Sequence, residues 1–457
     1  MTVITKKFGQ TRQITAHFLT QAGKVPGRSM RVSQPQQGQA LQIGKVFADF
    51  VSKATFSLHI AIYDFRLAGQ TGRAFVAALN ERARSGVDVR IAYNHAKKDR
   101  TPEVFAWLGA DPAPVGSAGF VGKLHPAIQR KGIADTAELE EPVRGEPIDP
   151  AAHLMHSKYI IRDGTLPSAA VLTGSTNFTN DAWSLQENNI LIFERAPELA
   201  RFYQNDFGEM WESGEIANSG RYDTGHVTVD GIPVSVAFSP GQGRQIDTDI
   251  AHTLSTARDR LLVASMVISS GPILGAIVDR AHRVREFAGI FDGTEMEGVI
   301  KDWARAGEAS AGQQRHTGAT SHRAHAQGHL TQTRRQHHDR RVHQRVRHMN
   351  SLAEVRSRAF YGKAHLFRSI APLLHSKVSL PYSPKSPHNF MHDKLAVCDN
   401  TVITGSYNFS SNATRNAENV VIVRDQALAN AYAEYVQVLM RDYPHRGLPG
   451  ADPSERG

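Results

Sequence analysis

The sequence contains a single cysteine, Cys398, in 457 residues. One cysteine excludes an intrachain disulfide and is typical of proteins from a reducing compartment. No uninterrupted apolar run approaches about 18 residues, so no membrane-spanning helix is predicted. The first twenty residues also lack the apolar segment of a signal peptide. We therefore expect a cytoplasmic location and at most peripheral membrane contact, with secretion by a non-classical route left open.

Positive charge is concentrated in one part of the chain. The net charge is +9, with 53 lysines and arginines against 44 acids. Residues 311–350 hold eight arginines, no lysine and one acid, Asp339, so they carry +7 of that total. The net positive charge of the whole chain therefore gives no evidence that the surface outside residues 311–350 binds nucleic acid.

Residues 307–350 are also unusual in composition. Eight histidines and eight arginines accompany only four sizeable apolar residues between 311 and 350, too few to offset the entropy cost of ordering. Three explanations are open: a disordered basic insertion, an altered reading frame, or a tract that binds nucleic acid or metal. The irregular spacing of the histidines argues against a defined metal site.

Strand and helix patterns alternate in the same order in both halves of the chain. Strand patterns occupy residues 56–65, 87–94, 261–270 and 286–293. Helical periods occupy residues 71–86, 248–260 and 272–284. Each half closes with a strand and a helix, at 188–213 and 418–443. This duplication predicts two similar α/β lobes, 1–220 and 221–457, with a boundary near 215–230.

A histidine and a lysine stand two positions apart at the head of one apolar run in each half. They are His156 and Lys158 in "HLMHSKYIIRDG", and His392 and Lys394 in "NFMHDKLAVCDN". Alternate side chains of a strand share a face, so each pair is expected to point the same way, about 7 Å apart.

Each apolar run ends in a hairpin signal, Asp163-Gly164 or Asp399-Asn400. The returning strands lead to "GSTNF" (174–178) and "GSYNF" (405–409). The hairpins are thus expected to bring Gly-Ser-x-Asn back beside His-x-Lys. The turn accounts for both aspartates, which are assigned a structural role.

These residue types suit a phosphate site. Lysine, asparagine and serine side chains can donate hydrogen bonds, and glycine lets an anion approach the backbone. A histidine on the same face can attack phosphorus or transfer a proton, because its pKa lies near neutrality. A glutamate follows each asparagine by ten residues, and a carboxylate can fix a histidine tautomer. Two facing half-sites would place histidines on opposite sides of one phosphodiester.

The segments 156–163 and 392–399 resemble the duplicated HKD motif of the phospholipase D superfamily. The resemblance covers most of both halves except about 97–150 and 307–350. It implies an α/β fold of two lobes, each a mixed β-sheet flanked by helices, related by a pseudo-twofold axis with the active site between them. It also implies a phosphohistidine intermediate, and neither a metal nor another cofactor.

Carried over to this sequence, the resemblance assigns roles to individual residues. The expected catalytic residues are His156 as nucleophile, His392 as general acid and base, and Glu187 and Glu418 orienting the histidines. The near-identical half-sites do not themselves decide which histidine is the nucleophile. The expected substrate-binding residues are Lys158, Ser175, Asn177, Lys394, Ser406 and Asn408.

Two functions are weighed for such a site. The first is a phospholipase D-type hydrolase that cleaves a phospholipid to phosphatidic acid and a head-group alcohol, favoured because one chain carries both motifs. The alternative is a metal-independent nuclease acting on DNA or RNA, which a genuine basic tract would favour. A phosphatidyltransferase, which usually has spanning segments, and a binding module with an inactive site are less favoured. The expected partner is a phosphodiester substrate, and the monomer is expected to be active.

Overall fold

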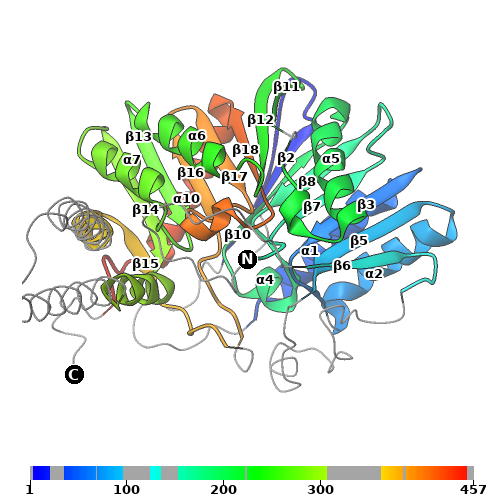
Figure 1. Cartoon of the computed structure of the whole chain (residues 1–457), viewed down its shortest axis with the longest axis horizontal. Helices are drawn as coiled ribbons and strands as arrows, with labels where there is room; N and C mark the ends of the chain where they lie inside the picture. Colours follow the sequence, from blue (N-terminus) through cyan, green and yellow to red (C-terminus); the bar gives the residue numbers. More distant parts are fainter. Residues whose placement is uncertain are drawn as a thin grey trace, which may run out of the picture.

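The computed structural model describes residues 4–20, 35–67, 69–95, 124–134, 153–221, 224–305, 362–383 and 387–449. Two eight-stranded sheets dominate this part of the chain. Figure 1 shows them side by side, the first in blue to teal and the second in green to orange. The predicted basic insertion at 307–350 lies outside the described residues.

The first sheet has the strand order β1-β2-β10-β8-β7-β3-β5-β6. Its strands are β1 (Ile4–Phe8), β2 (Ile14–Leu19), β3 (Ser57–Ile62), β5 (Asp88–Asn94), β6 (Gln129–Ile133), β7 (Lys158–Arg162), β8 (Ala170–Gly174) and β10 (Asn188–Phe193). Strands β3, β5 and β6 pair in parallel, and the other neighbours are antiparallel. The sheet is therefore mixed.

The second sheet repeats this topology strand for strand, in the order β11-β12-β18-β17-β16-β13-β14-β15. Its strands are β11 (Gly225–Val229), β12 (Ile232–Ser239), β13 (Arg260–Ser265), β14 (Glu286–Asp292), β15 (His375–Lys377), β16 (Lys394–Cys398), β17 (Thr401–Gly405) and β18 (Glu418–Arg424). A short additional pair joins β4 (Phe65–Arg66) to β9 (Phe178–Thr179). The predicted α/β fold of two similar mixed sheets is confirmed.

Helices cover both faces of each sheet. They are α1 (Gln37–Ser52), α2 (Gly69–Arg84), α4 (Asn180–Ser184), α5 (Pro197–Ser213), α6 (Gly243–Ser255), α7 (Gly271–Ala281) and α10 (Gln426–Asp442). The helices α1, α2 and α4 form one core with the first sheet, and α6 and α7 form another with the second. The helices α5 and α10 belong to a third core that contains residues of both sheets. Apolar residues of both lobes therefore pack in one shared core.

The two predicted hairpins, β7–β8 and β16–β17, are present and antiparallel. Asp163 and Asp399 occupy their turns with φ of 53° and 49°, the left-handed conformation that aspartate tolerates. The Asp163 carboxylate accepts the backbone N–H groups at the start of β3, and that of Asp399 accepts those at the start of β13. Each aspartate thereby ties its hairpin to the adjacent strand.

Candidate active site

Each motif histidine lies just before its strand and is held by the backbone of the opposite lobe. The sequence predicts that the histidines begin strands, but β7 and β16 begin two residues later. The N–H of His156 donates to the carbonyl of Ala417 at 2.8 Å, and that of His392 donates to Glu187 at 3.1 Å. These bonds across the interface replace bonds along the histidines' own hairpins. Both histidines therefore lie where the lobes meet.

His156 is bonded to a glutamate from the other lobe. Its Nδ1 lies 2.7 Å from Oε2 of Glu418, and both side chains are buried. Burial raises the pKa of Glu418 to about 8, and the charges of Lys158 and Lys394 oppose that rise. In its ionised form Glu418 accepts the Nδ1 proton of His156, which leaves the lone pair of the ring on Nε2.

His392 has a neutral partner instead. Its Nδ1 lies 3.0 Å from Oδ1 of Asn188, another residue of the opposite lobe. The amide is oriented from both ends, because its Nδ2 donates to the carbonyl of Ala182 and its Oδ1 accepts the Ser175 hydroxyl at 2.8 Å. Since an amide oxygen only accepts, Nδ1 of His392 carries a proton. Asn188 thus fixes the tautomer without contributing a charge.

Glu187, predicted to orient a histidine, has different partners in the structure. Its fully buried carboxylate accepts hydrogen bonds from Lys377 Nζ at 2.6 Å and from the Tyr443 hydroxyl at 2.5 Å. Burial raises the pKa of Glu187, and the Lys377 charge opposes that rise. The prediction that the Glu187 carboxylate orients a motif histidine is therefore corrected: the carboxylate is the acid of a buried ion pair, and Glu187 meets His392 only through its backbone carbonyl.

One extra residue in the first lobe explains this difference. Asn189 and Asn419 are equivalent, because the N–H of each donates to the serine of its own motif, Ser175 or Ser406. The serine and asparagine are separated by 14 residues in the first lobe and by 13 in the second.

The extra residue changes which side chain reaches the histidine. Glu418 directly precedes Asn419 in the sequence. In the first lobe Asn188 directly precedes Asn189, and Glu187 lies two positions before it. Neighbouring side chains of an extended segment point to opposite faces. The equal spacing of the two glutamates from their motif asparagines is therefore misleading, and Asn188 is the counterpart of Glu418.

Both motif lysines are buried beside their histidines. Lys158 Nζ donates to the carbonyl of His156 at 2.7 Å, and Lys394 Nζ donates to that of His392 at 2.5 Å. Burial lowers the pKa of Lys394 to about 7, although the charges of Glu418 and Asp393 oppose the fall. An anionic substrate would favour the ammonium form of this lysine.

Anion binding should consequently weaken as the pH rises above 7. Below that pH Lys394 is charged, and above it the lysine loses its proton. A dialkyl phosphinate stays anionic throughout this range, so its dissociation constant should rise by up to about tenfold per pH unit between pH 7 and 9. Titration calorimetry measures this. The Lys394→Arg variant, whose guanidinium stays charged, should lose the part of this dependence that Lys394 causes and keep the part caused by Glu418, whose pKa is about 8. Constant affinity of the native protein over this range would contradict it.

The motif asparagines carry the same unusual feature in both lobes. In the described part of the chain, the buried Oδ1 atoms of Asn177 and Asn408 have no hydrogen-bond partner. A buried polar atom without a partner is costly, and amide oxygen and nitrogen positions are interchangeable in assignment. Both amides therefore keep hydrogen-bonding capacity that a polar ligand could use.

The motif glycines and serines have structural contacts. At Gly174 and Gly405 φ is 150° and 141°, and an added Cβ would lie within 2.2 Å and 2.3 Å of the carbonyl oxygen of the neighbouring strand. Close packing of strands, rather than approach of an anion, thus requires glycine there. The hydroxyls of Ser175 and Ser406 accept N–H groups of those same strands. These bonds place the serines in the framework of the site.

Tyr63 is a site residue that the sequence did not reveal. It directly follows β3, and its ring centroid lies 4.9 Å from that of His156. The Lys158 ammonium lies 5.3 Å from the same ring. A tyrosine directly after the largely apolar run 58–62 was the available signal in the sequence. Tyr63 forms one wall beside the first histidine.

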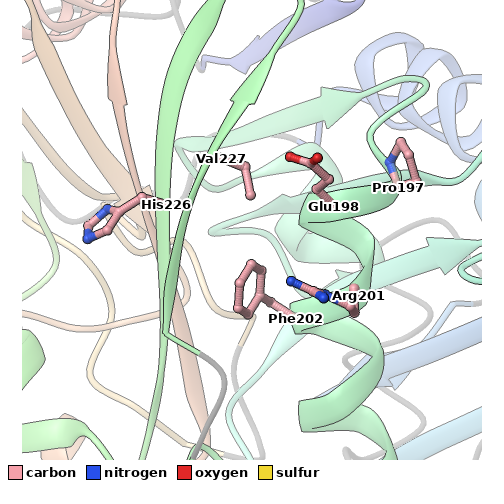
Figure 2. Close-up of a pocket in the computed structure, with 6 residues that line it drawn as sticks. All are labelled: Pro197, Glu198, Arg201, Phe202, His226 and Val227. Carbon is pink, nitrogen blue, oxygen red and sulfur yellow. The ribbon is translucent and has the colours of Figure 1, made fainter.

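A surface cavity of about 410 Å³ lies between α5 and β11. Figure 2 shows Arg201 and Phe202 of α5 extending toward β11, and His226 on the opposite side of that strand. None of its lining residues belongs to either half-site.

Among the residues that the structure describes, no three His, Cys, Asp or Glu side chains converge as metal ligands. No helix in those ranges is both long and apolar enough to cross a bilayer.

Comparison with known proteins agrees with this geometry. The profile of the family described as "Cardiolipin synthase, PLD-like domain" matches residues 47–211 and 250–440. These two matches cover most of the chain, one in each lobe. The chain therefore belongs to the phospholipase D superfamily, which confirms the resemblance seen in its motifs.

Individual relatives match shorter stretches. A mitochondrial cardiolipin hydrolase of Xenopus tropicalis is 37% identical over 76 residues, 16% of this chain and 35% of that protein. A phospholipase D of Rickettsia conorii is 51% identical over 45 residues, 9% of this chain and 22% of that protein. The chain thus spans about a third or less of these relatives. The crystal structure of a Haemophilus influenzae phosphatidylserine synthase shares the fold, with a TM-score of 0.51, 11% identity, and coverage of 96% of this chain and 88% of that one.

Proposed function

We propose that this chain is a phospholipase D-type phosphodiesterase that hydrolyses a phospholipid to phosphatidic acid and a head-group alcohol. The observation that carries the proposal is the pair of buried histidines at the lobe interface, each held through Nδ1 by an acceptor of the opposite lobe. The buried lysine that accompanies each histidine supports an anionic substrate.

The proposed reaction has two displacements at phosphorus. In the first, Nε2 of His156 attacks phosphorus, the bond from phosphorus to the alcohol oxygen breaks, and the Nε2 proton of His392 passes to the departing oxygen. In the second, water attacks the phosphohistidine, its proton returns to His392, and the bond to His156 breaks. Charged or polar donors, Lys158 and Lys394 among them, would stabilise the negative charge on the non-bridging oxygens.

A lipid substrate is supported by the relatives named above, a cardiolipin hydrolase and a phospholipase D. The matches cover only part of those proteins, so a lipid substrate is proposed for this chain on the basis of similarity. The nuclease considered from the sequence depends on the basic tract at 311–350, which lies outside the described residues.

Parallel assays on four substrates test the proposal. The purified chain should release phosphatidic acid from phosphatidylcholine or cardiolipin vesicles and leave single-stranded DNA and RNA intact. Cleavage of nucleic acid without lipid cleavage would replace the lipid hydrolase by a nuclease. Transfer of the phosphatidyl group to an added alcohol in place of water would instead identify a transferase.

A further inference from the structure

The pseudo-symmetry of the two half-sites is broken next to the histidines. His156 faces a carboxylate, Glu418, at 2.7 Å, whereas His392 faces a carboxamide, Asn188, at 3.0 Å. Asn188 and Glu418 occupy equivalent positions at the starts of β10 and β18. Two histidines with the same backbone setting therefore have different partners: Glu418 can carry a negative charge, and Asn188 cannot.

The two displacements place opposite demands on these partners. Positive charge develops on the nucleophilic imidazole when its Nε2 bonds to phosphorus, and a neighbouring carboxylate stabilises that charge. Positive charge leaves the general acid when it delivers its proton, and a carboxylate would hold that proton back. A neutral acceptor fixes the ring without this penalty.

We propose that Asn188 is a positioning residue that makes His392 the general acid, and that Glu418 makes His156 the nucleophile. This inference rests on the proposed function, because it assigns the two histidines of that reaction. The one-residue extension of the first lobe is its structural origin, since it places an amide where the second lobe has an acid.

The other charged groups around His392 are already engaged. Asp393 accepts the Asn189 amide at 2.7 Å and the Tyr435 hydroxyl at 2.6 Å. Glu187 is paired with Lys377 at 2.6 Å.

Two further charged groups lie on the neighbouring segments. Asp292 accepts the N–H of Met391 at 3.0 Å and the Ser379 hydroxyl at 2.7 Å. Lys394 donates to the His392 carbonyl. The three carboxylates beside His392 therefore have bonding partners of their own, and Asn188 is the group that meets Nδ1.

The first test compares leaving groups. A nitrophenolate leaves without protonation, whereas an alkoxide needs a proton. His392→Ala should lose about 10³-fold or more of its first-turnover rate on an alkyl diester but much less on a p-nitrophenyl diester. His156→Ala should lose the first turnover on both. Equal losses for His392→Ala on the two esters would overturn the assignment.

The second test changes the partner itself. Asn188→Asp places a carboxylate beside His392 and should move the basic limb of kcat/KM for the alkyl diester upward by about one pH unit. Asn430→Asp, which adds the same charge on the exposed face of α10, should leave that limb unchanged. A limb that does not move in Asn188→Asp would contradict the role of Asn188.

Trapping the intermediate separates this inference from the function on which it rests. The native protein is quenched in alkali during turnover of a phosphorus-labelled diester, and the labelled peptide is identified by mass spectrometry. Label on His156 is expected. Label on His392 would overturn the inference and leave the phosphodiesterase intact, whereas absence of both turnover and label on every diester would overturn the proposed function.

Discussion

Alanine at His156 should lower kcat for phosphodiester hydrolysis by about 10⁴-fold or more, because the variant loses the atom that bonds to phosphorus. Alanine at His392 should cost about 10³-fold to 10⁴-fold on an alkyl ester, the usual worth of a general acid. Steady-state assays on vesicles and on a small diester measure both losses. The double variant should be little worse than His156→Ala, because residues that act as a unit are not additive.

The control for these variants is His226→Ala. His226 is exposed on β11 and bonds to Ser235, so its loss should leave kcat unchanged. Thermal unfolding of each variant shows whether the fold persists. Near-native rates in a folded His156→Ala protein would remove that histidine from the mechanism.

Replacing Lys377 with methionine should reduce the free energy of unfolding by about 3–5 kcal/mol. The Lys377–Glu187 pair is buried, with side-chain exposures of 5% and 0%. Loss of the ammonium leaves a carboxylate without its counter-ion in the interior, where the charged form is strongly disfavoured. The pKa of Glu187 is already raised by burial, so the loss should shrink at lower pH as the carboxyl takes up a proton. Denaturant unfolding at several pH values measures it.

Two companion variants complete this test. Lys377→Met combined with Glu187→Gln should recover most of the stability, because the amide keeps an acceptor for the Tyr443 hydroxyl without a buried charge. Lys301→Met removes an exposed i,i+4 pair with Glu297 and should cost less than about 1 kcal/mol. Similar losses for Lys377 and Lys301 would contradict the buried pair. The rate of turnover by the stable double variant also tests the role of Glu187. A native rate indicates a structural role, and a large loss indicates the orienting role that the sequence predicted.

Local patterns were sufficient for much of the fold. The alternation of apolar strands and periodic helices predicted two similar α/β lobes, and the two sheets have the same strand order. The aspartates at the turns correctly placed the hairpins β7–β8 and β16–β17. Such features depend on side-chain periodicity and turn chemistry within about ten residues, which a single sequence displays directly. The N-terminal strands of each lobe, β1–β2 and β11–β12, were missed because their short runs lack a motif that would set them apart.

The histidines, lysines and asparagines could be read from their repeated spacing, but their partners could not. Glu187 and Glu418 stand at equal sequence distances from their motif asparagines, yet only the carboxylate of Glu418 is bonded to a histidine ring. That outcome depends on which strands meet across the lobe interface and on one extra residue, which turns a side chain to the opposite face. Composition and motif spacing thus predict a duplicated phosphate-binding chemistry. The partner of each imidazole, and with it the inequality of the two half-sites, follows from long-range register, because the bonding atoms belong to residues more than 200 positions apart.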